Sequence, residues 1–158
     1  MVKRFLNASD ADHGGDKESG KSTTGVISKY AGGAITRMSQ RQSSVAISTT
    51  EAEVVAASEA TRELVWLKLK RLLNDVTEFL REPEIQIDNE ADIHLAQNPE
   101  YHRRTKHIEI RHFFVREKVT AGEIGVRRVA TEHQVADAFT KALHGPRLKH
   151  LLSKMGLG

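Results

Sequence analysis

The sequence contains no cysteine and few aromatic residues, which make up 5% of its 158 residues. Without cysteine, neither a disulfide framework nor a Cys-based zinc site is possible, so an oxidising compartment is not required. The low aromatic content argues against a surface on which single-stranded nucleic acid would stack. No run of about 18 apolar residues occurs, and the N-terminus becomes polar too soon for a signal peptide. We therefore expect a soluble protein with no membrane partner, or a fragment of a longer protein.

The length and the charge pattern narrow the class of protein further. A chain of 158 residues is typical of one domain and can bury a core without metal or disulfide staples. The net charge is only +3, but residues 102–118 contain six Lys or Arg, two Glu and three of the eight histidines. Such clustering is typical of a strip that faces phosphates, and a solvated helix face is the alternative.

The hydrophobic pattern predicts an α/β fold in one domain, residues 1–158. Alternating residues and turn signals predict strands at residues 3–10, 24–30, 34–39, 85–88 and 125–129. Helical spacing predicts helices at residues 50–74, 89–97 and 106–121, one that begins at Thr131, and a C-terminal extension helix at about 146–156. A right-handed crossover through the long helix should place the fourth strand parallel to the first, in a mixed sheet.

Two overlapping capping boxes stand at the N-terminus of the long helix. Ser48 and Glu51 form one box, and Thr50 and Glu53 form the other. We expect the second box to cap the helix. Glu51 would then be free in the first turn and able to face the ends of two strands.

Acidic residues mark the carboxyl ends of two predicted strands. Asp10 ends the first strand and Asp88 ends the fourth, at the sheet edge where ligands collect in open α/β sheets. The long helix would bring Glu51 to this edge, and the helix from Thr131 would bring Asp137. Four carboxylates repel one another unless cations bind, and Mg²⁺ or Mn²⁺ prefers oxygen ligands. Two such ions about 3.5–4 Å apart are a standard device for phosphodiester hydrolysis. The alternative is that these four are unrelated members of the 21 acids.

Seven short motifs follow one another along the chain. They are Ser9-Asp10-Ala11-Asp12, Lys21-Ser22-Thr23-Thr24-Gly25, Arg41-Gln42-Ser43-Ser44-Val45-Ala46, Ser48-Thr49-Thr50-Glu51-Ala52-Glu53, Asp88-Asn89, Arg104-Thr105-Lys106-His107-Ile108 and Thr131-Glu132-His133-Gln134-Val135-Ala136-Asp137. Together they resemble the ribonuclease H domain at the carboxyl end of the polyprotein of copia-type LTR retrotransposons, over residues 7–157. The resemblance implies a ribonuclease H-like mixed five-stranded sheet flanked by helices. The catalytic and metal-binding acids that it implies are Asp10, Glu51, Asp88 and Asp137.

The resemblance also implies a substrate and partners. The expected activity is hydrolysis of the RNA strand of RNA/DNA hybrids during reverse transcription, with two Mg²⁺ ions for which Mn²⁺ can substitute. The expected partner is the reverse transcriptase polymerase domain of the same polyprotein, and the expected location is an intracellular virus-like particle in the cytoplasm. Basic residues should bind phosphates, and polar residues should contact the RNA 2′-hydroxyl. The candidates are Arg37, Arg41, Gln42, Ser44, Asn89, Arg103, Arg104, Lys106 and His107.

Two other functions fit parts of the same pattern. An integrase-like nuclease would use three acids with the glutamate on a late helix, whereas here the glutamate lies between the two strand aspartates. The second function is that of a domain that binds nucleic acid or docks on the polymerase and has weak or no activity in isolation. Asp12 and Asp16 are typical of turn residues. His133 lies four residues before Asp137, where it either replaces the mobile histidine of many ribonucleases H or, the reading we favour, lies at the surface.

Overall fold

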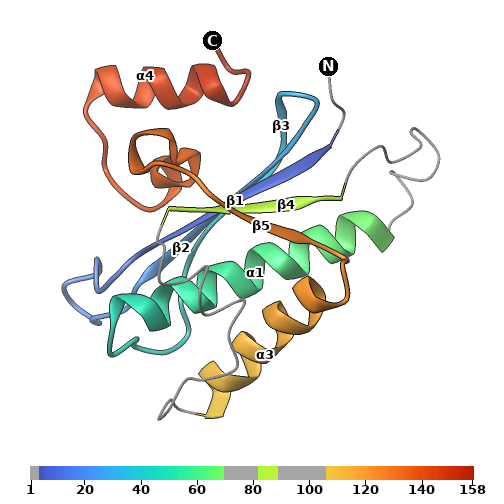
Figure 1. The fold of residues 1–158 in the computed structure, drawn as a ribbon. Helices are drawn as coiled ribbons and strands as arrows, with labels where there is room; N and C mark the ends of the chain where they lie inside the picture. The colour runs from blue at the N-terminus through green and yellow to red at the C-terminus, as the bar shows by residue number, and fades with distance from the viewer. Residues whose placement is uncertain (1–3, 70–81, 89–105) are drawn as a thin grey trace.

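A computed structural model describes residues 4–69, 82–88 and 106–158, which form a mixed sheet with helices on both faces (Figure 1). The strand order is β3-β2-β1-β4-β5. β1 is antiparallel to β2, and β2 to β3, whereas β4 is parallel to β1, and β5 to β4. The strands are β1 (Phe5–Asp12), β2 (Thr23–Tyr30), β3 (Gly33–Arg41), β4 (Glu84–Ile87) and β5 (Gly125–Arg128). The predicted five-stranded mixed sheet is confirmed.

Two helices, α1 (Thr49–Leu69) and α3 (Lys106–Thr120), cover one face of the sheet (Figure 1). Ala56, Ala60, Leu64 and Leu67 of α1 are buried, as their spacing predicts, because they share one side of the helix. The amide nitrogen of Asn7 on β1 donates a hydrogen bond of 3.1 Å to the carbonyl oxygen of Ala60. Small side chains let α1 approach the sheet closely, and truncation of Leu64 to Ala should cost about 2–5 kcal/mol.

The other face carries the C-terminal part of the chain. It consists of the 3₁₀ helices η1 (Thr131–His133) and η2 (Val135–Phe139) and the helix α4 (Gly145–Lys154). Leu151 and Met155 are fully buried against Ala8 and Ile27 of the sheet. The expected C-terminal helix therefore exists and packs on the sheet.

The single helix predicted to begin at Thr131 is wrong. The N-cap position is Ala130 and makes no side-chain capping bond, and two short 3₁₀ helices replace the expected α-helix. The buried side chain of Gln134 donates from Nε2 to the carbonyl oxygen of Ser9 at 2.9 Å and accepts from the backbone N–H of Ala136. The glutamine is thus used to join η2 to β1 rather than to complete a capping box.

Some predicted features lie outside the described residues. These are the last turn of the long helix, the helix at 89–97 and the basic loop at 100–105. Within the described ranges, no helix has the length and apolar character that crossing a membrane requires.

Candidate metal centre

The pairing of β1 with β4 brings Asp10 and Asp88 to the same level of the sheet. The two strands are parallel, and Ala8 lies opposite Gln86. Asp10 lies two residues after Ala8, still within β1, and Asp88 lies two residues after Gln86, directly after β4. The expectation that the first and fourth strands are neighbours is therefore confirmed.

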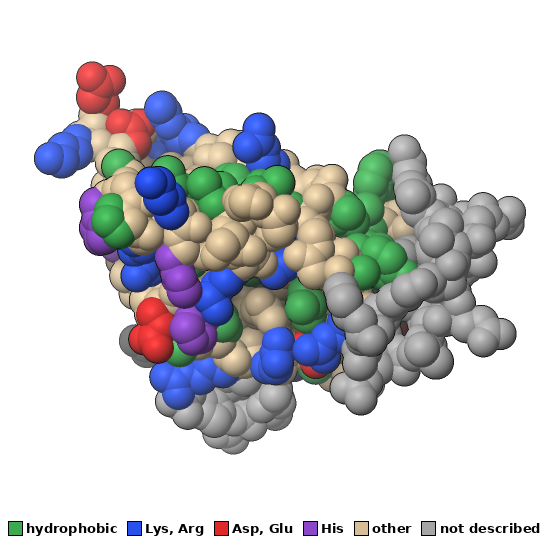
Figure 2. Space-filling view, turned by 90° about the horizontal axis from the view of Figure 1, so that it is seen from above, with side chains coloured by type: hydrophobic (Ala, Val, Ile, Leu, Met, Phe, Trp, Pro, Cys, Tyr) green, Lys and Arg blue, Asp and Glu red, His purple; other side chains and the backbone are tan. Residues whose placement is uncertain are grey.

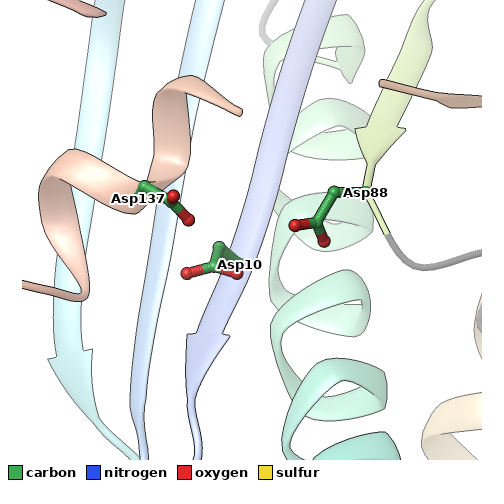
Figure 3. A group of neighbouring side chains, drawn as sticks. All are labelled: Asp10, Asp88 and Asp137. Atoms are coloured by element: carbon green, nitrogen blue, oxygen red, sulfur yellow. The ribbon is translucent and has the colours of Figure 1, made fainter. Parts of the chain in front are cut away.

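Asp137 completes a group of three carboxylates from the opposite side of β1. One carboxylate oxygen each from Asp10, Asp88 and Asp137 lies within 4.8 Å of the others. Figure 3 shows Asp10 between the other two, with Asp137 on the short helix η2 and Asp88 at the end of β4. Asp10 and Asp137 are buried, whereas Asp88 is half-buried. The group is thus largely enclosed, and Asp88 is its most exposed member.

Gly25 allows η2 to lie this close to the sheet. Gly25 pairs with Asp10 across β1 and β2. A Cβ atom at this position would lie 2.6 Å from Cγ2 of Thr140 and 2.9 Å from the carbonyl oxygen of Ala136. Only a residue without a side chain leaves room for the segment that carries Asp137 and Thr140.

Burial raises the pKa of Asp10 to about 6. The hydroxyl of Thr140 donates to Oδ2 of Asp10 at 2.5 Å and lowers this pKa, as does the charge of Lys141. The negative charges of Asp137 and Asp88 raise it. The Asp10 carboxylate is therefore held at an energetic cost, which a bound cation would offset.

Two basic side chains balance part of the negative charge. Nζ of Lys141 lies 3.0 Å from Oδ1 of Asp137 and 3.4 Å from Oδ2 of Asp10. NH2 of Arg147 lies 2.5 Å from Oδ2 of Asp137. Burial lowers the pKa of Lys141, but Asp10 and Asp137 together raise it above its usual value. Neither cation was predicted from the sequence. Lys141 lies four residues after Asp137, which is a spacing that could have indicated the contact, whereas no pattern in the sequence indicates the contact of Arg147.

The capping assignment at α1 is the reverse of the prediction. The hydroxyl of Ser48 accepts from the backbone N–H of Glu51 at 3.1 Å, and the carboxylate of Glu51 accepts from the backbone N–H of Ile47 at 3.0 Å. The box of Ser48 and Glu51 therefore caps α1, and Glu51 is not free. Among the described residues, the carboxylate group around Asp10 includes neither Glu51 nor Glu53.

Glu53 reaches the strand that carries Asp10. Its Oε1 accepts a hydrogen bond of 3.2 Å from the backbone N–H of Ala11, the residue after Asp10. Glu53 is buried, and β1 continues here beyond its pairing with β4, which ends at Ala8. Of the two glutamates at the start of α1, Glu53 is the one that contacts the strand end beside Asp10.

The donor set fits a hard divalent cation. Carboxylate oxygens are the ligands that Mg²⁺ and Mn²⁺ prefer, and no softer ligand takes part in the described group. Burial is the main cause of the raised pKa of Asp10, and the charges of Asp137 and Asp88 add to it, so a cation at the group would stabilise the ionised form. Asp88, which is half-buried, is the most accessible of the three carboxylates.

Several predicted hybrid-binding residues line one cavity beside the N-terminal half of α1. Arg41, Gln42, Ser44 and His107 contribute to a cavity of about 260 Å³ between β3, α1 and α3. Arg41 is exposed and pairs with Asp16 at 2.9 Å. The amide nitrogen of Gln42 donates to Thr24 and to the carbonyl oxygen of Ala52, so its donor capacity is used within the protein.

The remaining candidates lie elsewhere. Arg37 lines a neighbouring cavity of about 420 Å³, which shares Met38, Glu59 and Arg62 with the first. Lys106 is exposed at the start of α3. The candidates that fall outside the described residues are Asn89, Arg103 and Arg104.

Three expectations about single residues can be compared with the structure. Asp12 was expected in a turn, but it is the last residue of β1 and pairs with Thr23, so this expectation is wrong. Asp16 accepts hydrogen bonds from the Ser19 hydroxyl and from the backbone N–H of Glu18, which lower its pKa and confirm a turn role. His133 is exposed; its Nε2 is 4.0 Å from Glu132, and its ring centroid is 6.1 Å from that of His150. Its surface position agrees with the favoured alternative.

Comparisons with known proteins point to one family. The chain is 40% identical over 149 residues to the retrovirus-related Pol polyprotein from transposon TNT 1-94 of Nicotiana tabacum, and 36% identical over 150 residues to that from transposon RE1 of Arabidopsis thaliana. Each match covers 94% of this chain but only 11% and 10% of the relatives, so the chain spans about a tenth of their length. No protein-family model matches.

Solved structures show which fold the chain has. LC11-RNase H1, isolated from compost by a metagenomic approach, superimposes with a TM-score of 0.64 at 18% identity, covering 89% of this chain and 94% of that one. The structure of the same protein in complex with an RNA/DNA hybrid superimposes with a TM-score of 0.62 at 16% identity, covering 87% of this chain and 94% of that one. Prototype foamy virus protease-reverse transcriptase gives 0.54 at 12% identity, covering 99% of this chain and 20% of that one. The fold is that of ribonuclease H.

Proposed function

The chain is homologous to one segment of the retrovirus-related Pol polyproteins of plant transposons and has the ribonuclease H fold, and from this premise we propose that it is a metal-dependent ribonuclease H. Its substrate would be the RNA strand of an RNA/DNA hybrid made during reverse transcription. The observation that carries the proposal is the group formed by Asp10, Asp88 and Asp137 at the carboxyl ends of β1 and β4.

We assign the fourth carboxylate to α1. The sequence predicted Glu51, but its carboxylate accepts from the N–H of Ile47, whereas Glu53 contacts the backbone beside Asp10. The geometry therefore favours Glu53 as the α1 ligand. Asp10, Asp88, Asp137 and Glu53 would hold two Mg²⁺ ions, for which Mn²⁺ can substitute.

The chain's own residues prepare this site through contacts that fix the carboxylates and through burial. Two bound divalent ions would activate an attacking water and offset charge on the leaving oxygen. Asp10 is fixed by the hydroxyl of Thr140, and Asp137 is fixed by Lys141 and Arg147. The burial of Asp10 and Asp137 keeps bulk water away from the metal-facing oxygens and strengthens their interaction with a cation.

Recognition of the hybrid would use the cavities beside α1. Arg41, Ser44 and His107 line one cavity and Arg37 lines the next, so basic and hydroxyl groups lie along two adjoining cavities. Such groups bind phosphates and the 2′-hydroxyl that distinguishes RNA from DNA. The similar fold of LC11-RNase H1, solved with an RNA/DNA hybrid, supports this class of substrate.

The polyprotein context supplies the proposed partner. The curated relatives are Pol polyproteins about ten times as long as the matched segment, and foamy virus protease-reverse transcriptase contains a unit of the same fold. We infer that the polymerase domain of the same polyprotein delivers the hybrid, within an intracellular particle. A domain that binds the hybrid but depends on this partner for activity remains the second candidate function.

The test uses a duplex with a labelled RNA strand paired to DNA, incubated with the 158-residue chain and Mg²⁺. We expect cleavage of the RNA strand, its loss in the variant Asp10→Asn, and its persistence in Glu18→Gln, which removes an exposed turn carboxylate. Cleavage by Asp10→Asn would contradict the site, and equal cleavage of duplex DNA would contradict the ribonuclease H activity. Binding of the hybrid without cleavage, at every Mg²⁺ concentration, would favour the second candidate function.

A further inference from the structure

The C-terminal helix α4 contributes one side chain to the candidate metal centre. Arg147, near the start of α4, places NH2 2.5 Å from Oδ2 of Asp137. The same nitrogen donates a hydrogen bond of 3.1 Å to the carbonyl oxygen of Thr131, where η1 begins. One guanidinium group therefore joins α4 to two points of the segment that carries Asp137.

α4 is anchored firmly enough to hold Arg147 in place. Leu151 and Met155 are fully buried on the sheet, and the backbone N–H of Ala34 donates to the carbonyl oxygen of Met155 at 2.9 Å. The side chain of Arg147 itself is 29% exposed, so about two thirds of it is enclosed. A fixed helix and an enclosed side chain restrict the positions that the Asp137 carboxylate can take.

Lys141 contacts the same carboxylate in a different way. Its ammonium group bridges Oδ1 of Asp137 and Oδ2 of Asp10, which are members of the clustered group. Arg147 contacts the other oxygen of Asp137, Oδ2. Lys141 therefore contacts two of the carboxylates that would hold a metal ion, whereas Arg147 contacts Asp137 through its other oxygen.

We propose that Arg147 is a positioning residue that fixes Asp137 for metal binding, and that Lys141 is the cation that a bound metal ion replaces. This inference rests on the proposed function, because it takes the carboxylate group as a metal site. The two roles predict opposite effects. Removal of a nearby positive charge should strengthen the binding of a divalent cation, whereas loss of a positioning contact should weaken it, since Asp137 must then be ordered when the ion binds.

The test measures Mn²⁺ affinity by isothermal titration calorimetry on the full 158-residue chain. The variants are Arg147→Met, Arg147→Lys, Lys141→Met and, as a matched control, Lys149→Met. Lys149 lies exposed on the same helix. Figure 2 views the molecule from above, and the Lys and Arg side chains on this face are spread out rather than gathered in one patch. We expect Arg147→Met to weaken Mn²⁺ binding about 10- to 100-fold and Arg147→Lys to recover part of it. Lys141→Met should bind Mn²⁺ more tightly, and Lys149→Met should stay within about twofold because its charge is screened.

A second measurement does not depend on metal. In chelator, a double-mutant cycle of Arg147→Met with Asp137→Asn should give a coupling in the free energy of unfolding, because each change removes the same contact. Should Arg147→Met fail to fold, Arg147→Lys keeps the charge, and it should still bind Mn²⁺ more weakly than the unsubstituted chain at a similar melting temperature.

The role of Arg147, the role of Lys141 and the metal centre itself would each be contradicted by a different result. Equal or tighter Mn²⁺ binding by a folded Arg147→Met would overturn the positioning role, and weaker binding by Lys141→Met would overturn the replacement of Lys141. An unsubstituted chain that binds no Mn²⁺ would contradict the metal centre itself, and the positioning role would fall with it.

Discussion

Asp10 is the residue whose protonation should be visible in the stability of the protein. Its pKa is raised from 3.8 to about 6, chiefly by burial. Between these values the folded protein holds a proton that the unfolded chain has released, so the free energy of unfolding falls as the pH rises through this window. The ionised side chain then costs about 3 kcal/mol at neutral pH.

The variant Asp10→Asn removes this cost. Measured by urea denaturation in chelator, its free energy of unfolding should exceed that of the unsubstituted chain at pH 7, and this difference should shrink to near zero at about pH 4. A difference that stays constant over this range would mean that burial does not raise the pKa of Asp10.

The two glutamates of α1 should have separable effects. Glu53→Gln should reduce hybrid cleavage about 100-fold or more, because it weakens a proposed metal ligand. Glu51→Gln should cost about 0.5–2 kcal/mol of stability, because it weakens the helix cap, and should leave the cleavage rate nearly unchanged. Cleavage assays and thermal melts of the two variants check this, and the reverse pattern would restore the assignment that the sequence favoured.

Single residues differ in how far the sequence could reveal them. Asp10 and Asp88 could be found because each lies near the carboxyl end of a strand that the sequence pattern reveals, Asp10 two residues before the end of β1 and Asp88 directly after β4. The sequence could not show which of Glu51 and Glu53 faces Asp10, since each occupies the same place in a capping box. Their backbone contacts in the fold distinguish them, because Glu51 accepts from the N–H of Ile47 and Glu53 from that of Ala11. Arg147 carried no signal because its contact depends on how α4 folds back onto the sheet.

At the scale of elements, the approach of η2 to β2 should control the site. Gly25→Ala would place a Cβ atom 2.6 Å from Thr140 and 2.9 Å from the carbonyl oxygen of Ala136. We expect a loss of about 1–3 kcal/mol in stability and a lower cleavage rate, because Asp137 and Thr140 must move away from Asp10. Gly33→Ala is the matched control, since its nearest neighbour would be 3.8 Å away.

Urea denaturation and cleavage assays on both glycine variants test this account. If Gly25→Ala and Gly33→Ala behaved alike, the close approach of η2 would not be what holds the carboxylates together.

The strands and the long helices were predictable because their periodicity is regular and their turns contain glycine. The predicted strand at 24–30 became β2 (Thr23–Tyr30), and the predicted helix at 106–121 became α3 (Lys106–Thr120). The helix from Thr131 was not predictable, since a capping-box pattern says nothing about the carbonyl oxygen of Ser9 that takes the side chain of Gln134. Local patterns thus revealed most helices and strands, and the segment from Thr131 differed from its pattern because of a long-range hydrogen bond.

At the scale of the whole molecule, we propose that the elements on both faces of the sheet serve one site. α1 supplies Glu53 from one face, and η2 and α4 supply Asp137 and Arg147 from the other. Because the clustered carboxylates repel one another, Mg²⁺ should raise the melting temperature near neutral pH, and it should do so less in Asp10→Asn. Equal melting temperatures in chelator and in excess Mg²⁺ would contradict a tight acidic group.

The most direct test of the central claim is a crystal structure with an RNA/DNA hybrid and Mn²⁺, in which the anomalous signal locates the ions. We expect two anomalous-difference peaks about 3.5–4 Å apart, beside a phosphate of the RNA strand and surrounded by Asp10, Asp88, Asp137 and Glu53. Lys141 should be displaced from the carboxylates, and Arg147 should still contact Asp137. A hybrid bound with no ion at these carboxylates, or with the RNA strand away from them, would contradict it.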